Sequence, residues 1–71
     1  MTRPDVTVMH GRMSAIVSGD RAVDAVDAAG VVRVPTFSGF QIPIVDLPRI
    51  RAVCESRGWR LVEHETRRAT T

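Results

Sequence analysis

The side chains that can act as nucleophiles, general bases or metal ligands are few and widely spaced in this sequence. The chain has one cysteine, Cys54, and two histidines, His10 and His64. One thiol and two imidazoles do not supply the four ligands of a structural zinc site. Within 63–65 the strand period directs the two glutamates to one side and the histidine to the other, so no acid–base pair forms there. The sequence therefore predicts no catalytic residue, no metal site and no cofactor, and we expect a protein that is not an enzyme.

Two further groups of polar or reactive residues fit structural roles. Asp20, Asp24 and Asp27 recur at i, i+4 and i+7, which is the spacing of one outward stripe of a helix. A metal would need further oxygen ligands from a second element, so a solvated helix face is expected, with an acidic contact surface for a partner as the alternative. Cys54 falls on the apolar stripe of another expected helix, where the expected role is that of a small buried hydrophobe.

The length of 71 residues allows one small domain, which we expect to span 1–65, with 66–71 as a frayed C-terminal tail. The composition, 44% hydrophobic and 25% charged, is typical of neither a disordered segment nor a membrane span. The first residues lack an apolar signal-like stretch, and the unpaired cysteine favours a reducing compartment. We therefore expect a cytoplasmic location and no membrane contact. A domain this small buries a thin core, which dimerisation would stabilise.

All ten basic residues are arginine and none is lysine, against eight acidic residues, so the net charge is +2. Guanidinium groups suit phosphate oxygens, which makes nucleic acid a candidate partner. The arginines form no dense basic block, however. They lie at positions 3, 12, 21, 33, 49, 51, 57, 60, 67 and 68. Genome composition explains this usage more simply than phosphate recognition does, and nucleic-acid binding is the second choice of function.

Hydrophobic periodicity predicts two strands and a helix in the first half of the chain. Apolar and polar residues alternate at 6–8 and again at 13–17, and a turn with Gly11 at positive φ would join these runs as a hairpin. The segment 21–29 follows the helical period, with Asp20 as its N-cap and a glycine after its last residue.

The second half predicts three strands and a second helix. Strands are expected at 31–34 and 41–45, and the glycine in the segment between them favours a hairpin. A helix is expected at 46–57, followed by a glycine and by a strand at 59–62. The apolar stripe of this helix comprises Leu47, Ile50, Val53 and Cys54.

The order strand, strand, helix, strand, strand, helix, strand predicts an α+β fold. Its last six elements match the split βαβ, ferredoxin-like plan, so we expect a small antiparallel sheet with two helices on one face and an extra N-terminal strand. A β-meander followed by one helix and a strand is the alternative, which applies if 21–29 is extended. Pro43 conflicts with the ferredoxin-like plan, because that plan places a residue without an amide hydrogen in an internal strand.

Alternation along the expected strands assigns residues to the two faces of the sheet. The residues expected to face the helices are Met13, Ala15, Val17, Val32, Val34, Ile42, Ile44, Trp59 and Leu61. The residues expected on the open face are Ile16, Val31, Arg33, Val45, Arg60, Val62 and His64. An open face of this composition is apolar enough to need a cover, and it lacks the aromatic residues on which RNA-recognition sheets rely.

Phe37 and Phe40 bracket the tip of the hairpin expected between 31–34 and 41–45. Turned inward, they would close the end of the core; turned outward, they would form an apolar anchor for a protein partner. The candidate partner-binding residues are Phe37, Phe40, Ile16, Val31, Arg33, Val45, Arg60 and Val62. If the partner is nucleic acid instead, the phenylalanines would stack on bases, with Arg33 and Arg60 near the phosphates.

These features favour a non-catalytic interaction protein that forms a homodimer and binds a protein partner of unknown identity. Its size suits an accessory or regulatory factor of the kind that phages and mobile elements encode. The alternative function is a nucleic-acid-binding module that uses the scattered arginines, with an affinity that falls steeply as salt is raised.

Overall fold

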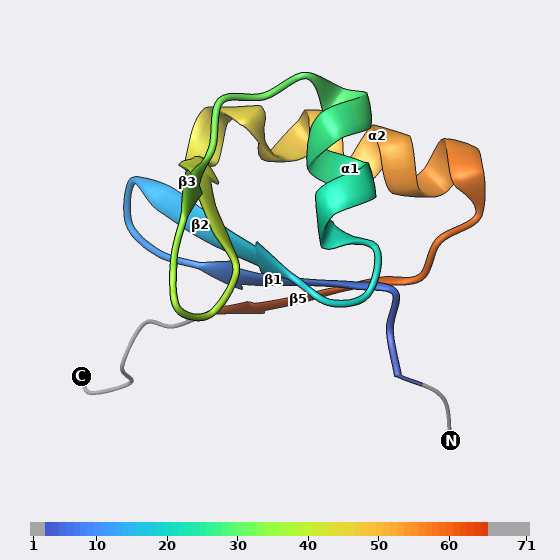
Figure 1. Cartoon of the computed structure of the whole chain (residues 1–71), viewed down its shortest axis with the longest axis horizontal. Coiled ribbons are helices and arrows are strands. Elements are labelled where there is room, and N and C mark those ends of the chain that lie inside the picture. Colours follow the sequence, from blue (N-terminus) through green and yellow to red (C-terminus); the bar gives the residue numbers. More distant parts are fainter. Residues whose placement is uncertain (1–2, 66–71) are drawn as a thin grey trace.

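The computed structural model of the chain describes residues 3–65 as a small α+β domain, with one five-stranded sheet and both helices on the same face of it (Figure 1). The strands are β1 (Val6–His10), β2 (Ser14–Ser18), β3 (Val34–Pro35), β4 (Phe40–Pro43) and β5 (Leu61–Glu65). The helices are α1 (Ala22–Ala29), the 3-10 helix η1 (Ile44–Asp46) and α2 (Leu47–Arg57). The tail expected at 66–71 lies outside the described residues.

The sheet is mixed, so the prediction of an antiparallel sheet is wrong in one place. Its strand order is β3-β4-β2-β1-β5, in which β5 runs parallel to β1 and every other neighbouring pair is antiparallel. The ferredoxin-like plan would place β5 directly beside β2. Here β1 lies beside β2 instead, because two strands joined by a tight turn pair with each other first. The N-terminal strand is therefore inserted inside the sheet rather than added to it.

The β1–β2 hairpin agrees with the alternation at 6–8 and 13–17. His10 pairs with Ala15, and the Gly11 amide donates to the Ser14 carbonyl oxygen at 2.8 Å. Gly11 does not take the positive φ expected of it. A side chain there would nevertheless collide with the Ser14 carbonyl, because a Cβ on Gly11 would lie 2.8 Å from that oxygen. The glycine is required by the close approach of two backbones rather than by its dihedral angles.

Both predicted helices are present, which excludes the β-meander alternative. Gly30 and Gly58 each follow the last helical residue in the left-handed conformation, as expected of C-terminal glycines. The side-chain cap expected of Asp20 is absent, and α2 has no side-chain cap either. Asp20 precedes the Arg21 N-cap and reaches Arg3 instead, and Asp46 occupies the N-cap of α2 without a side-chain bond to it.

The two strands on either side of the β3–β4 turn are shorter than expected. Val31 follows the glycine that ends α1 and is buried in the core, as the residue after such a cap often is. The chain then enters the sheet only at β3. On the other side, β4 ends at Pro43 and the chain turns into η1, which carries Val45 out of the sheet. Val31 and Val45 therefore do not lie on the open face, where we expected them.

Pro43 fits the sheet because its nitrogen faces a gap. The amide of Ile44 donates to the Met13 carbonyl oxygen at 3.0 Å, so Ile44 directs its amide toward β2 and the preceding residue directs its nitrogen the other way. That side faces β3, whose pairing with β4 reaches only from Pro35 to Val34. The missing hydrogen-bond donor of Pro43 thus costs no sheet bond.

The core lies between the helices and the covered face of the sheet. Valines of β1 and β2 form its floor, and small residues of α1 allow that helix to lie close to them. The buried hydrophobic residues are Val6, Val8, Ala15, Val17, Ala22, Ala25, Val26, Val31, Ile42, Leu47, Ile50 and Cys54. Several expected core residues are not among them: Val34 and Val32 are exposed, as is Met13 in the β1–β2 turn.

We expect Gly39→Ala to destabilise the fold by at least about 2 kcal/mol, because its environment admits no side chain. The φ angle of Gly39 is 152°, and a Cβ there would lie 2.3 Å from the carbonyl oxygen of Val17. Gly30→Ala is the matched control: its φ of 68° is also unfavourable for alanine, but nothing lies within 4 Å of the added Cβ. Chemical denaturation followed by Trp59 fluorescence measures both. Equal losses for the two variants would contradict the steric role of Gly39.

Candidate functional site

The sheet face opposite the helices carries a continuous row of cross-strand neighbours. The strand registers place Val34 beside Gln41, Gln41 beside Ile16, and Ile16 beside Met9. Met9 in turn lies beside His64 of β5. Figure 1 shows both helices on the other side of the sheet, so no described element covers this row. Val34 is 55% exposed and Met9 41%. We call this surface the open face.

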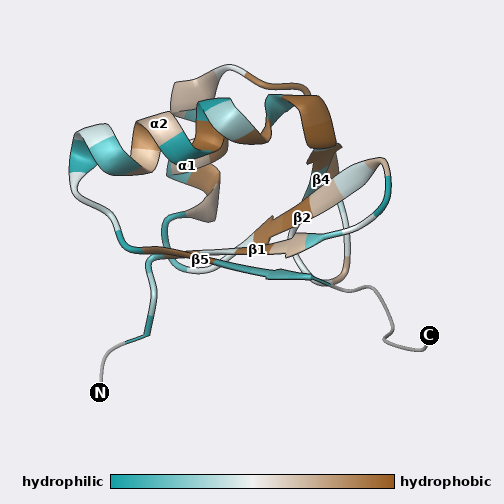
Figure 2. Cartoon of the chain, turned by 180° about the vertical axis from the view of Figure 1, so that it is seen from behind, coloured by the Kyte–Doolittle hydropathy of each residue, from teal (hydrophilic) through white to brown (hydrophobic). Residues whose placement is uncertain are grey.

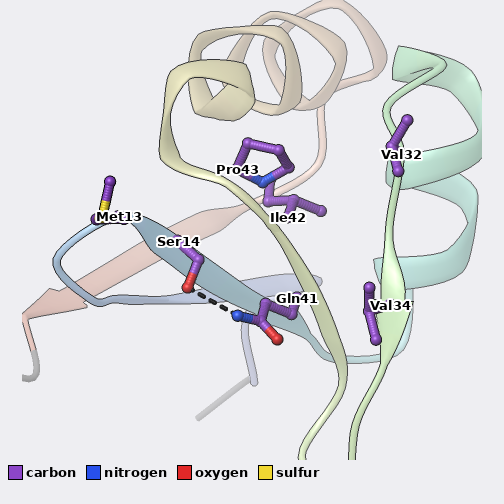
Figure 3. Close-up of a pocket in the computed structure, with 7 residues that line it drawn as sticks. All are labelled: Met13, Ser14, Val32, Val34, Gln41, Ile42 and Pro43. Atoms are coloured by element: carbon purple, nitrogen blue, oxygen red, sulfur yellow. Dashed lines mark hydrogen bonds between the residues drawn. The ribbon is translucent and has the colours of Figure 1, made fainter.

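A shallow hollow of about 340 Å³ lies at the end of the open face near the β1–β2 turn. It opens where β3 separates from β4 (Figure 3). Val32 and Val34 stand on one side of it and Pro43 on the other, with Met13 at its end. Gln41 crosses its floor and donates from Nε2 to the hydroxyl oxygen of a serine on β2 at 3.0 Å. Val32 is 76% exposed and Met13 82%, so the hollow continues the apolar character of the row.

The open face carries no carboxylate and no guanidinium on any residue of β1 to β5. Its strand residues are Thr7, Met9, Ser14, Ile16, Ser18, Val34, Gln41, Pro43, Val62 and His64. The charged side chains of the strands, Glu63 and Glu65, point to the helix side of the sheet. Figure 2 shows the hydropathy along the chain, with brown on β2 and β4 and teal on the later part of β5.

The structure places three of the expected open-face residues where we expected them and moves three others away. Ile16 and Val62 lie on this face and are partly exposed, and His64 lies on it and is exposed. Val31 and Val45 have left the sheet, as described above. Arg33 lies on the helix side, where it pairs with Asp27 of α1 and its guanidinium carbon stands 5.5 Å from the centre of the Phe40 ring.

Arg60 lies just before β5 and is exposed. Its backbone joins β5 to the residues ahead of β1: its amide donates to the Asp5 carboxylate at 2.9 Å, and its carbonyl oxygen accepts from the Val6 amide at 3.0 Å. The backbone contacts of Arg60 thus hold the start of the parallel β1–β5 pair.

The two phenylalanines of the β3–β4 turn have separate environments. Phe37 is fully exposed at the tip, in a turn closed by a hydrogen bond from the Thr36 amide to the Gly39 carbonyl oxygen. Phe40 is half-buried and packs on the edge of the core. The expected aromatic pair is therefore one solvent-exposed ring and one structural ring.

The scattered arginines are largely paired within the chain. Among residues 3–65, Arg3 pairs with Asp20, Arg21 with Asp24, Arg33 with Asp27 and Arg51 with Glu63. Arg21 and Arg57 also stand over the Trp59 ring, each 5.5 Å from its centre. None of these contacts lies on the open face, and Asp20, Asp24 and Asp27 each pair with an arginine.

A charged cluster ties α2 to the last strand on the helix side of the sheet. The i,i+4 spacing predicts that Arg51 pairs with Glu55, but Arg51 reaches Glu63 of β5 instead. Its Nε and Nη2 donate to the two carboxylate oxygens of Glu63 at 2.7 and 2.9 Å. Nε2 of His10 lies 2.6 Å from Oε1 of the same carboxylate. This bidentate Arg51 contact, with a smaller effect of His10, lowers the pKa of Glu63 to about 2 despite partial burial.

Cys54 is buried in the core, as its place on the α2 stripe predicts. Burial raises the pKa of the Cys54 thiol, and the Asp5 carboxylate adds to this effect. Both influences favour the neutral thiol over the nucleophilic thiolate, so Cys54 acts as a packing residue. In residues 3–65 no three His, Cys, Asp or Glu side chains come together as metal ligands.

No family model, curated protein or solved structure is significantly similar to this chain. The geometry of its own surface is therefore the guide to its function. Neither helix within 3–65 has the length and apolar character needed to cross a membrane.

Sequence reasoning missed Met9 and Gln41 of the open face and assigned Val34 to the helix side. Two signals in the sequence point to them. If the strand at 6–8 is extended to His10, alternation places Met9 on the face of the sheet opposite to the buried Val6 and Val8. The proline at 35 is typical of a sheet edge, which predicts a short outer strand with exposed valines rather than a full core strand.

We expect Glu63→Gln to flatten the acid dependence of stability. The pKa of the Glu63 carboxyl is about 2 in the folded chain, below the ordinary value of about 4.3 for the unfolded chain. Its stabilising contribution is thus complete above pH 4.3 and is lost as pH falls from there toward 2. Because Glu63 is partly exposed, we expect this contribution to be about 1 kcal/mol at neutral pH.

Denaturant unfolding at a series of pH values measures this contribution. Glu55→Gln is the matched control, because Glu55 is an exposed carboxylate on α2 outside the cluster. A Glu63→Gln variant whose stability falls with acid as steeply as that of the native chain would contradict the role of the cluster.

Proposed function

We propose that the protein is a non-catalytic interaction module whose open face binds an apolar, uncharged surface of another protein. The observation that carries this proposal is the row from Val34 to Met9, with the adjoining hollow, on a sheet face whose strand residues include no carboxylate or guanidinium. A quarter of the chain is charged, so the absence of such groups from the strand residues of this face sets it apart from the rest of the surface. Exposed apolar surface of this kind is typical of interaction sites.

The chemistry of the face defines the partner. Charged residues on a partner would lose their hydration against the open face without gaining a counter-charge, which costs free energy. Burial of apolar residues of the partner would instead stabilise the complex, by about 25 cal/mol for each square ångström of apolar surface removed from water. The hydroxyls of the face and Gln41 supply a few neutral hydrogen-bonding groups, which suit a protein surface or backbone. Binding is therefore expected to depend weakly on salt.

Nucleic acid is less well supported as the partner. A sheet that binds RNA uses exposed aromatic rings for stacking and cations for the phosphates, and the described strands present neither on the open face. Arg33, which we expected there, is held against α1. We propose that it acts in the cytoplasm as an accessory or regulatory protein.

Val34→Lys is expected to abolish partner capture while leaving the fold intact. Val34 is exposed and lies at the outer end of the row, so a lysine there is tolerated by the fold but places a charge in the proposed interface. We expect a loss of affinity of at least about tenfold. The measurement is retention of proteins from host lysate on the immobilised chain, at high salt and after nuclease treatment.

Val23→Lys is the matched control for this experiment, because Val23 is a valine of similar exposure, 47%, on α1. It should retain the same proteins as the native chain. Phe37→Ala tests the hairpin tip separately, since Phe37 contributes nothing to the core. Loss of capture with Phe37→Ala but not with Val34→Lys would show that the tip, rather than the open face, is the anchor. Retention that disappears with nuclease or moderate salt would favour the nucleic-acid alternative.

A further inference from the structure

The two edges of the sheet differ in how well they are protected. At one edge β3 has only two residues and contains Pro35, both of which are features that prevent further strand pairing. At the other edge β5 has five residues and contains neither a proline nor a glycine. In residues 3–65 no strand pairs with its outer side. The sheet therefore has one closed edge and one edge able to accept another strand.

The backbone groups of β5 that face outward follow from its pairing with β1. The Arg60 carbonyl oxygen accepts from the Val6 amide, so Arg60, Val62 and His64 direct their backbone groups toward β1. The alternating residues Leu61 and Glu63 direct theirs away from the sheet. These outward groups form a short template for an antiparallel strand.

We propose that a second copy of this chain pairs with the outer edge of β5, so that two sheets join into one across a two-fold axis that passes beside Val62. A second copy is the occupant that the structure itself supplies, because its own β5 is an open edge of the same length. The interface is then self-complementary, as a two-fold contact must be. The proposal goes beyond the proposed function, because it concerns the β5 edge and a second copy rather than the open face and another protein.

The register follows from the side chains. A two-fold centred on Glu63 would set two carboxylates directly opposite each other, which is unfavourable. Centring it on Val62 sets Val62 against Val62 of the second copy on the open-face side, and Arg60 opposite His64. Leu61 then pairs with Glu63 of the second copy and exchanges both backbone hydrogen bonds with it. Each Glu63 carboxylate keeps its Arg51 partner, which limits repulsion across the axis.

Charge-swapped variants at Val62 test this arrangement. We expect Val62→Lys and Val62→Glu each to weaken self-association at least about tenfold, because like charges meet at the axis. A mixture of the two variants should associate as well as the native chain. Gln41→Lys, which adds the same charge to the open face far from β5, should associate normally. Sedimentation velocity over a concentration series measures all four samples, with Trp59 fluorescence as the check of folding.

Amide hydrogen exchange of the native chain provides a test without substitutions. The amides of Leu61 and Glu63 should become protected as concentration rises, whereas those of Val62 and His64 should be protected throughout by β1. Rapid exchange of Leu61 and Glu63 at every concentration, or a native chain that stays monomeric, overturns the proposal. An effect of Gln41→Lys equal to that of Val62→Lys overturns it in favour of face-to-face packing. Loss of the β5 pairing itself leaves capture through Val34 unchanged, so this proposal and the proposed function fail separately.

Discussion

The insertion of β1 between β2 and β5 is the constraint on which the rest of this structure depends. Val6 and Val8 of β1 are fully buried, and they supply the centre of the core floor. Because β1 occupies the place beside β2, β5 is displaced outward and becomes an edge strand. The sheet gains a fifth strand, but two short helices cover only one of its faces. The open face, its uncharged row and the free edge of β5 all follow from this placement.

The two sides of the sheet have different physical characters. On the helix side, ion pairs such as Arg51–Glu63 and Arg33–Asp27 surround an apolar core and join the helices to the segments beside them. On the open face, the strands carry valine, isoleucine, methionine and small hydroxyl residues without ionised partners. A thin core stabilises a chain of this size only modestly, so burial of the open face or of the β5 edge against another molecule would add to its stability.

Local patterns in the sequence predict the elements better than they predict their arrangement. The helices at 22–29 and 47–57 follow from apolar periodicity and from the glycines that end them, and the β1–β2 hairpin follows from alternation. The parallel pairing of β5 with β1 joins residues more than fifty positions apart, for which the sequence has no local signal. The errors at Val31 and Val45 arose where a helix cap and a proline turned the chain out of the expected strands. Ile16 and Val62 were placed correctly because they lie in regular strands.

The most direct test of this account is the accessibility of the open face in a single copy of the chain. Relaxation of methyl protons by a soluble paramagnetic chelate, at a concentration low enough to keep the chain monomeric, reports which side chains meet solvent. The account predicts strong relaxation at Met9 and Val34, which lie on the open face. It predicts weak relaxation at Val8 of β1 and Val17 of β2, which lie on the covered face. Weak relaxation at all four positions would show that the face is already sealed within one copy and would contradict the account.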